Sequence, residues 1–219
     1  MILLAPFVSF GTLVHLMSVT AIDVIDGRTA RRNRNRDAVL DAMIELTNKT
    51  EEEPAIEAIA ERAGVSYRSV YRYFDDRTEL LLAAIGRVMR DVWPLFEIDQ
   101  TTDRDFDERV DALISSRLTA YRRLAPLTRL AMRRAVTEPI VVVEFNNVRA
   151  HLREQLEQLF SPELDQIELD DRSVVVTTLD VMFQFEALEF LARYDGLDDA
   201  AMRRILDRHV RAHLAAATS

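Results

Sequence analysis

The residues with the clearest chemical potential lie in one short segment, between Ser66 and Phe74. Val70 and Phe74 stand one helical turn apart and are expected to pack inward. The side chains between them would then face outward: Tyr67, Arg68, Ser69, Tyr71, Arg72 and Tyr73. Solvated helix faces are usually rich in Glu and Lys, whereas phenols and guanidinium groups hydrogen-bond to phosphates and base edges. This face therefore indicates contact with nucleic acid.

Two short helices are expected to position this face. Four side chains have the i, i+3, i+4, i+7 spacing of one helix: Ile56, Ile59, Ala60 and Ala63. Gly64 would end that helix, and Ser66 suits the N-cap of the next one. Helix, Gly-containing turn and helix is the arrangement of a helix-turn-helix motif.

The segment from Ala60 to Leu82, AERAGVSYRSVYRYFDDRTELLL, resembles the N-terminal DNA-binding domain of the tetracycline-repressor (TetR) family. The likeness covers about 36–89 and rests on these residues: Ile59-Ala60, Ala63-Gly64-Val65-Ser66, Val70-Tyr71, Tyr73-Phe74, Arg77 and Leu80-Leu81. The resemblance implies an all-α fold. It would have an N-terminal three-helix DNA-binding domain with the helix-turn-helix, and a larger C-terminal helical domain for ligand binding and dimerisation.

The resemblance also implies roles for individual residues. Tyr71, Tyr73 and Arg77 would contact phosphates, with Arg77 in place of the family's usual lysine. Tyr67, Arg68 and Ser69 would face base edges, and Arg34 and Arg36 would lie near the DNA backbone or reach a minor groove. The expected DNA-binding residues are Arg34, Arg36, Ser66, Tyr67, Arg68, Ser69, Tyr71, Arg72, Tyr73 and Arg77.

Two positions depart from the family pattern. Ala55 stands where the family usually has a Thr that caps the second helix and touches a phosphate, so the resemblance does not extend to that contact. Arg68 replaces a residue that is commonly small, and it suits a bidentate contact to guanine. The arginines from Arg31 to Arg36 have two interpretations, a solvated tail or a DNA-contacting arm.

The composition agrees with a helical protein that binds nucleic acid at one end. The chain has 219 residues with only five Gly and no Cys, which favours long helices and excludes disulfides, cysteine–zinc sites and thiol catalysis. The net charge is −9, but residues 28–90 hold 12 basic and 11 acidic residues, whereas residues 91–219 hold 16 and 24. The acidic excess therefore lies in the C-terminal part.

A hydrophobic period of 3.6 residues predicts helices through most of the remaining chain. They are expected over about 33–47, 76–94, 106–126, 127–131, 141–162, 172–194 and 199–214, with Pro94, Pro126 and Pro162 ending three of them. An acidic cap near Asp76 suits the start of the second of these. Apolar residues occupy most faces of the 172–194 helix, which should be buried on more than one side.

Eight residues are expected to line a ligand cavity in the C-terminal domain: Tyr121, Met132, Phe145, Thr177, Asp180, Met182, Phe183 and Gln184. The aromatic and Met side chains suit an ordinary core equally well, and both interpretations are open. Thr177, Asp180 and Gln184 form a polar stripe, which either orients a small apolar or amphipathic ligand or faces solvent.

Burial on several faces of the 172–194 helix needs more surface than one bundle supplies, and a second subunit is the simplest source. The family resemblance implies the same, a homodimer through helices at about 172–194 and 199–214. Such a dimer would present two recognition helices to half-sites about 34 Å apart. An unidentified small-molecule effector that prefers one helix arrangement would then change the affinity for DNA.

Residues 1–22 contain no charged residue and would reach about 33 Å as a helix, enough for a membrane anchor. Pro6 and Gly11 weaken that interpretation, and the alternatives are an upstream extension of the reading frame or a tail. The arginines that follow would keep the folded part in the cytoplasm in each case. The expected organisation is an extension over 1–27, a DNA-binding domain over 28–90 and a ligand-binding and dimerisation domain over 91–219.

No other constellation points to chemistry. His209 and His213 have a metal-compatible spacing, but no H-E-x-x-H motif accompanies them, and we expect neither a metal nor a cofactor. The sequence offers no catalytic constellation, so we expect no enzyme. We expect a transcriptional regulator that acts as a repressor, binds a double-stranded DNA operator and is released by its ligand. The alternatives are a membrane-anchored regulator and a helical ligand-binding protein without operator binding.

Overall fold

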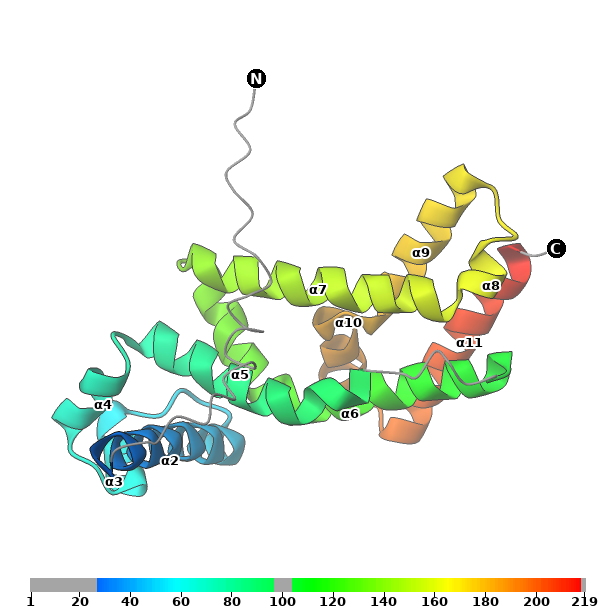
Figure 1. The fold of residues 1–219 in the computed structure, drawn as a ribbon. Helices are drawn as coiled ribbons and strands as arrows, with labels where there is room; N and C mark the ends of the chain where they lie inside the picture. The colour runs from blue at the N-terminus through cyan, green and yellow to red at the C-terminus, as the bar shows by residue number, and fades with distance from the viewer. Residues whose placement is uncertain (1–26, 97–103, 218–219) are drawn as a thin grey trace. The chain divides into compact units, whose positions relative to one another are not determined.

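The structure, a computed structural model, describes residues 27–96 and 104–217, and these residues form helices without any strand (Figure 1). The chain divides into two compact units. The first unit is formed by Met1–Arg90 and Pro126–Asn147, and the second by Asp91–Ala125 and Val148–Ser219. The predicted all-α fold class is confirmed.

The first unit contains three whole helices and parts of three others. Its elements are α2 (Gly27–Thr50), α3 (Ile56–Ala63), α4 (Tyr67–Tyr73), most of α5 (Arg77–Phe96), the end of α6 (Phe106–Ala135) and the start of α7 (Pro139–Leu159). The second unit contains the end of α5, the start of α6, the rest of α7, α8 (Ser161–Leu164), α9 (Leu169–Phe183), α10 (Phe185–Glu189), the π-helix η1 (Phe190–Tyr194) and α11 (Asp199–Ala217).

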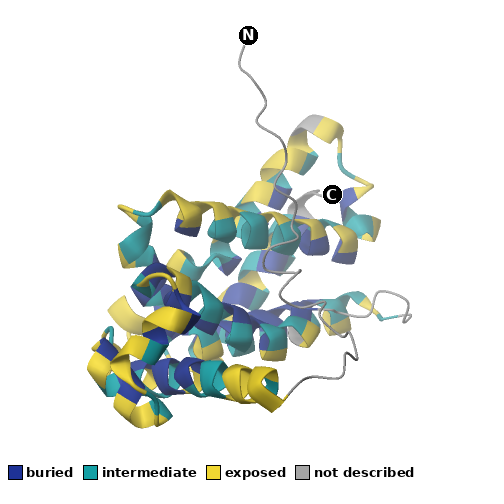
Figure 2. Ribbon diagram, turned by 60° about the vertical axis from the view of Figure 1, so that its left-hand side comes forward, coloured by how far each residue is buried: buried dark blue, intermediate teal, exposed yellow. Residues whose placement is uncertain are grey.

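The core of the first unit gathers side chains from both of its chain segments. The helix-turn-helix supplies Ile59, Val70 and Phe74, and the end of α6 supplies Leu127 and Leu130 to the same cluster. Figure 2 shows the buried residues on the inward faces of the helices. Residues 126–147, which the expected boundaries place in the ligand-binding and dimerisation domain, belong to the first unit.

The second unit is built around α6, α7, α9 and α11. Its core includes Leu113 and Ile114 from α6, Leu156 from α7, Leu179 from α9 and Leu206 from α11, all less than 2% exposed. Helix α9 packs against α11, where His209 Nε2 donates to the carbonyl oxygen of Thr178 at 3.0 Å. The apolar residues that recur with the helical period are therefore the ones that pack between these helices in one bundle.

Two of the expected helix ends are wrong, because both prolines lie inside a helix. Pro94 lies within α5, and Pro126 lies within α6, which joins the two helices predicted over 106–126 and 127–131. A proline in a helix lacks the N–H that would bond to the carbonyl four residues earlier. Burial of the apolar residues that follow, such as Leu127 and Leu130, offsets that lost hydrogen bond.

The single helix predicted over 172–194 is also wrong. Helix α9 begins earlier, at Leu169, and ends at Phe183, because Gln184 has an extended backbone with φ −69° and ψ 152°. The chain then continues as α10 and as η1, which ends at Tyr194 before the left-handed Gly196. The segment from Gln184 to Tyr194 has neither Gly nor Pro, so its local sequence carries no signal for the break.

Gly64 forms the turn of the helix-turn-helix in the left-handed region, with φ +66°. Its N–H donates to the carbonyl of Glu61, and the N–H of Val65 donates to that of Ala60 at 3.0 Å, which satisfies the last carbonyls of α3. A Cβ added at Gly64 would meet no atom within 4 Å. The requirement for glycine here is therefore one of backbone conformation alone.

We predict that Gly64→Ala lowers the free energy of unfolding by about 1 kcal/mol, the usual cost of a left-handed L-residue. Urea denaturation followed by circular dichroism measures it. Gly27→Ala is the matched control, since Gly27 begins α2 without a positive φ and a Cβ there also meets open space. Equal changes in the free energy of unfolding of the two variants would show that the positive φ of Gly64 is not the cause.

Candidate nucleic-acid interface

Helix α4 starts with the N-cap that the sequence predicts. Ser66 has an extended backbone, and its Oγ accepts from the N–H of Ser69 at 3.1 Å. The two hydroxyl groups, of Ser66 and Ser69, also lie 2.8 Å apart. The cap fixes the direction of α4 relative to the Gly64 turn, and so decides which side chains face outward.

The outward face of α4 carries two tyrosines and two arginines. Tyr67 and Tyr71 are 48% and 40% exposed, and Arg68 and Arg72 are exposed as well. The two tyrosine rings lie 5.1 Å apart between centroids, and their hydroxyl groups are 3.5 Å apart. The hydrogen bond to Tyr71 raises the pKa of Tyr67, so the Tyr67 phenol stays a neutral donor. The exposed hydroxyl and guanidinium groups of this face can donate hydrogen bonds to phosphates and base edges.

Tyr73 does not share this face, and its predicted outward position is wrong. It is only 7% exposed because its ring joins Val70 and Phe74 in the core of the first unit. Its hydroxyl oxygen accepts from Asn35 Nδ2 at 3.4 Å and from Arg72 Nη2 at 3.2 Å. Tyr73 therefore ties α4 to α2 through its ring and its hydroxyl.

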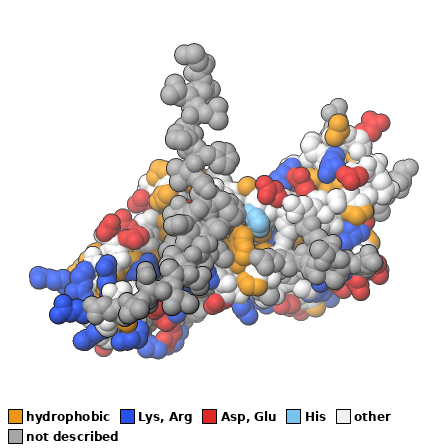
Figure 3. Space-filling view, viewed as in Figure 1, with side chains coloured by type: hydrophobic (Ala, Val, Ile, Leu, Met, Phe, Trp, Pro, Cys, Tyr) orange, Lys and Arg blue, Asp and Glu red, His pale blue; other side chains and the backbone are white. Residues whose placement is uncertain are grey.

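The arginines that precede this motif lie on a helix and not in an arm. Helix α2 begins at Gly27, so Arg31 to Arg36 form part of its first turns. Arg34 is exposed, whereas the Arg36 guanidinium lies 4.8 Å above the ring centroid of Phe74. Figure 3 shows Lys and Arg side chains gathered over the end of the first unit that holds α3 and α4. The basic cluster is thus held in place by a regular element.

Arg77, the predicted phosphate contact at the start of α5, is held by a carboxylate. Its Nε donates to Glu53 Oε1 at 2.7 Å, and its Nη2 donates to the carbonyl of Pro54 at 2.9 Å. The expected acidic cap of α5 is confirmed nearby, where Asp76 Oδ1 accepts from the N–H of Glu79 at 2.8 Å. The start of α5 is therefore fixed by both a cap and an ion pair.

Glu53 also binds the end of α6, which the sequence does not reveal. Arg134 Nη2 donates to the same Glu53 Oε1 at 2.5 Å, and Arg134 Nη1 donates to Thr78 Oγ1 at 2.9 Å. Burial raises the pKa of the Glu53 carboxyl, but hydrogen bonds from Arg77 and Arg134 outweigh it, so the pKa lies below its usual value. These residues stand up to 81 positions apart, and no local pattern pairs them.

Helix α3 lacks a side-chain cap, as its sequence implies. Ala55 has an extended backbone at the N-cap position and makes no side-chain hydrogen bond there. The remaining base-facing candidate, Ser69, is half-buried beside its cap partner Ser66. The structure thus places Arg34, Ser66, Tyr67, Arg68, Tyr71 and Arg72 at the surface, and it holds Arg36, Tyr73 and Arg77 in contacts of their own.

The expected ligand-cavity residues fall in two units. Met132 and Phe145 belong to the first unit, where Phe145 packs against the core. The other six belong to the second unit: Tyr121, Thr177, Asp180, Met182, Phe183 and Gln184. Tyr121 donates its hydroxyl to Glu189 at 2.7 Å, and Thr177 accepts from Arg153 at 3.2 Å. Their role in ligand binding stays a prediction.

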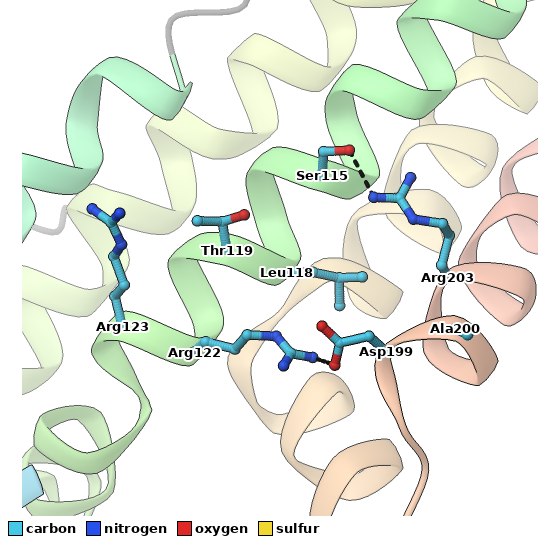
Figure 4. A pocket seen from close by; sticks show the side chains of 8 residues that line it. All are labelled: Ser115, Leu118, Thr119, Arg122, Arg123, Asp199, Ala200 and Arg203. Carbon is cyan, nitrogen blue, oxygen red and sulfur yellow. Dashed lines mark hydrogen bonds and ion pairs between the residues drawn. The ribbon is translucent and has the colours of Figure 1, made fainter.

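An open pocket of about 770 Å³ lies elsewhere in the second unit, between α6 and α11. Its lining is Ser115, Leu118, Thr119, Arg122, Arg123, Asp199, Ala200 and Arg203, which includes none of the expected cavity residues (Figure 4). Arg122 pairs with Asp199, and Arg203 Nη2 donates to Ser115 Oγ at 2.7 Å, whereas Arg123 lies apart from these contacts.

Two further expectations concern metals and membranes. Over residues 27–96 and 104–217, no cluster of three or more His, Cys, Asp or Glu side chains is arranged to hold a metal ion. Within the same ranges, no helix has the length and hydropathy needed to cross a bilayer. The apolar segment over 1–22, with its alternative role as an anchor, lies outside the described residues.

Comparisons with known proteins agree with this geometry. Residues 53–84 match the family model of bacterial regulatory proteins, tetR family. The HTH-type transcriptional repressor KstR of Mycolicibacterium smegmatis is 38% identical over 79 residues. That match covers 36% of this chain and 35% of KstR, so it spans about a third of the relative's length.

Solved structures share the fold over most of the chain. A transcriptional regulator from Rhodococcus sp. Rha1 has a TM-score of 0.63 and 18% identity, covering 86% of this chain and 98% of that chain. A protein assigned to the TetR family, from Mesorhizobium loti, has a TM-score of 0.64 and 19% identity, covering 85% of this chain and 98% of that one. The predicted resemblance and the two-part helical fold are confirmed.

We predict that Glu53→Gln lowers the free energy of unfolding by about 1 to 2 kcal/mol at neutral pH, because two arginines lose their charged acceptor. The lowered pKa sets the pH dependence: the contribution of Glu53 is present above the ordinary carboxyl pKa and is lost as the pH falls through the lowered value. Urea denaturation at several pH values measures both effects.

The matched control for this prediction is Glu52→Gln, which removes the same charge from an exposed neighbour. At every pH it should change the free energy of unfolding by roughly a few tenths of a kcal/mol. If the two variants still differ in free energy of unfolding at acid pH, Glu53 does not act through its charge.

Proposed function

We propose that this chain, whose residues 53–84 match the family model of bacterial regulatory proteins, tetR family, is a cytoplasmic, homodimeric transcriptional repressor. It binds a double-stranded DNA operator and is released by a small apolar or amphipathic effector. The observation that carries the proposal is the outward face of α4, with Tyr67, Arg68, Tyr71 and Arg72 exposed beside a capped helix start.

The side chains along α4 and at the start of α5 fall into two groups, those suited to contact bases and those suited to contact phosphates. Arg68 has no ion pair among the described residues, and its fork of donors matches guanine in a major groove. Tyr67 and Tyr71 present hydroxyl donors one helical turn apart. Arg77 has Nε and Nη2 engaged by Glu53 and Pro54, which leaves Nη1 for a phosphate. Base recognition is therefore assigned to Arg68 and Tyr67, and phosphate contact to Tyr71 and Arg77.

The surface of the second unit supports dimerisation. Val174 and Val181 stand two turns apart on α9, and Phe190 stacks on Tyr194 with centroids 5.9 Å apart. All four are more than half exposed, and Ile205 of α11 is exposed too. A second copy of the chain would bury this apolar surface through the helices over 169–194 and 199–217.

Regulation by an effector rests on the second unit. Six of the expected cavity residues gather there, including the half-buried Asp180. An effector changes operator affinity only if it binds one arrangement of the helices more tightly than another. The effector would therefore act through the packing of α6, α7 and α9.

We predict that Arg68→Ala reduces the difference in binding free energy between the preferred base and the other bases at one position by about 1 to 3 kcal/mol. Arg77→Ala should instead weaken binding to all duplexes alike. The measurement is a fluorescence titration of the full chain against duplexes from the region upstream of its own gene, at low and at physiological salt. Selective, salt-sensitive binding is the expected result for the unchanged protein.

Arg123→Ala is the matched control for these arginines, because it removes an equal charge from an exposed position of the second unit. It should leave the selectivity unchanged. Identical behaviour of Arg68→Ala and Arg77→Ala would refute the division into base and phosphate contacts. A folded dimer that binds no duplex selectively would favour a ligand-binding protein without operator binding.

We predict that Val181→Glu converts the dimer to a monomer, since a buried carboxylate in an apolar interface would lack a partner. Sedimentation velocity measures the change. Val143→Glu is the control: Val143 is 48% exposed on α7 of the first unit, close to the 54% of Val181. Dissociation by both substitutions, or by neither, would refute an interface on α9.

A further inference from the structure

Arg117 of α6 is a buried cation without a full set of partners. The residue is 3% exposed, and its Nη2 donates to the carbonyl oxygen of Leu152 on α7 at 3.2 Å. Its Nη1 has no hydrogen-bond partner among residues 27–96 and 104–217. The guanidinium lies 5.2 Å from the ring centroid of Phe96, so an aromatic face covers one side of it.

This arrangement is unfavourable in the protein alone. Buried charges in proteins are normally paired, and a buried donor without an acceptor keeps its desolvation cost. None of the ion pairs within 4 Å among residues 27–96 and 104–217 includes Arg117. Burial lowers the pKa of Arg117 to about 10, against the attraction of Asp180, so the group is still charged at neutral pH.

The acidic groups nearby do not supply the missing acceptor. Burial raises the pKa of the Asp180 carboxyl, although Arg153, a hydrogen bond with Gln184, Arg117 and Arg149 oppose that shift. Glu186 pairs with Arg149, and Glu157 Oε1 accepts from Arg153 at 3.1 Å. These two carboxylates are thus directed to other arginines, and Asp180 reaches Arg117 only through longer-range attraction.

Other features of the second unit suit a molecule with one polar end. Gln155 stands one turn beyond Leu152 on α7, and its buried Oε1 also lacks a hydrogen-bond partner in the part of the chain that the structure describes. Tyr121 and Phe185 pack with ring centroids 5.7 Å apart, and Trp93 stacks on His151 at 4.6 Å. The second unit therefore offers aromatic side chains together with buried polar atoms that have no hydrogen-bond partner among the described residues.

We propose that Arg117 is the counter-ion of a carboxylate on an otherwise apolar ligand that binds between α6, α7 and α9. This inference rests on the proposed effector response and names the chemical class of the effector, an apolar carboxylic acid in its ionised form. The carboxylate would accept from Nη1 and neutralise the buried cation. One free terminal nitrogen in an apolar setting suits a monoanion better than a doubly charged phosphate.

The open pocket between α6 and α11 is the competing location for an anion. Its Arg122 and Arg203 already pair with Asp199 and Asp111, and the pocket is open to solvent, where such pairs contribute little. Arg123 is the remaining arginine of that lining (Figure 4). Arg117 is favoured because its charge is buried and its Nη1 is unpaired.

The experiment compares decanoate with decanol, which share a chain length and differ in charge. Thermal unfolding and calorimetric titration are run on the full chain and on Arg117→Met, Arg117→Lys and Arg123→Met, below the micelle concentration. Met preserves the stem of Arg117 and removes an unpaired charge, so Arg117→Met should unfold at the same temperature or a higher one. Loss of binding in that variant would therefore not report misfolding.

We expect decanoate, but not decanol, to raise the melting temperature of the unchanged protein and of Arg123→Met. Arg117→Met should bind decanoate at least 10-fold more weakly, and Arg117→Lys should recover part of the affinity. Absence of decanoate binding would overturn the inference, and so would equal binding of decanol. Loss of binding in Arg123→Met alone would move the anion site to the open pocket and overturn it as well.

The same proteins titrated with operator DNA separate this inference from the proposed function. DNA binding without decanoate tests the regulator itself, whereas decanoate binding without DNA tests the site at Arg117. Decanoate should lower the operator affinity of the unchanged protein and leave that of Arg117→Met unchanged. Selective DNA binding together with no effect of decanoate would refute the ligand class alone.

Discussion

One carboxylate oxygen, Oε1 of Glu53, links three segments of the first unit. It accepts from Arg77 at the start of α5 and from Arg134 near the end of α6, and Glu53 itself lies just before α3. The Arg134 guanidinium extends the linkage to Thr78. Apolar packing supplies most of the stabilisation of such a unit, but it is not directional. The charged hydrogen bonds add the directional constraint that sets where α5 begins beside the helix-turn-helix.

The sequence predicts the parts of this protein that depend on near neighbours. The Gly64 turn, the Ser66 cap and the inward positions of Val70 and Phe74 follow from residues within a few positions of one another. The family resemblance, carried by the same short segment, extends that prediction to the all-α fold. Four of the expected surface contacts, at Tyr67, Arg68, Tyr71 and Arg72, are exposed for the same local reason.

What the sequence does not predict depends on distant residues. The buried Tyr73 accepts a hydrogen bond from Asn35, Glu53 accepts one from Arg134, and α6 continues past Pro126 to place Leu127 in the core of the first unit. The break at Gln184 has no Gly or Pro to mark it. In each case tertiary packing overrides a local preference, and periodicity within one helix contains no information about its partner.

The first unit is discontinuous in sequence, and this sets the order in which it can fold. Leu127, Leu130, Ala131 and Val141 complete a core whose other buried residues come from the chain before Arg90. A ribosome that adds about 5 to 20 residues per second needs several seconds to make the intervening chain and the second segment. During that time the apolar face of the helix-turn-helix is left partly uncovered. The N-terminal helices of this protein therefore reach their final state only after the first segment of the second unit, Asp91–Ala125, has been synthesised.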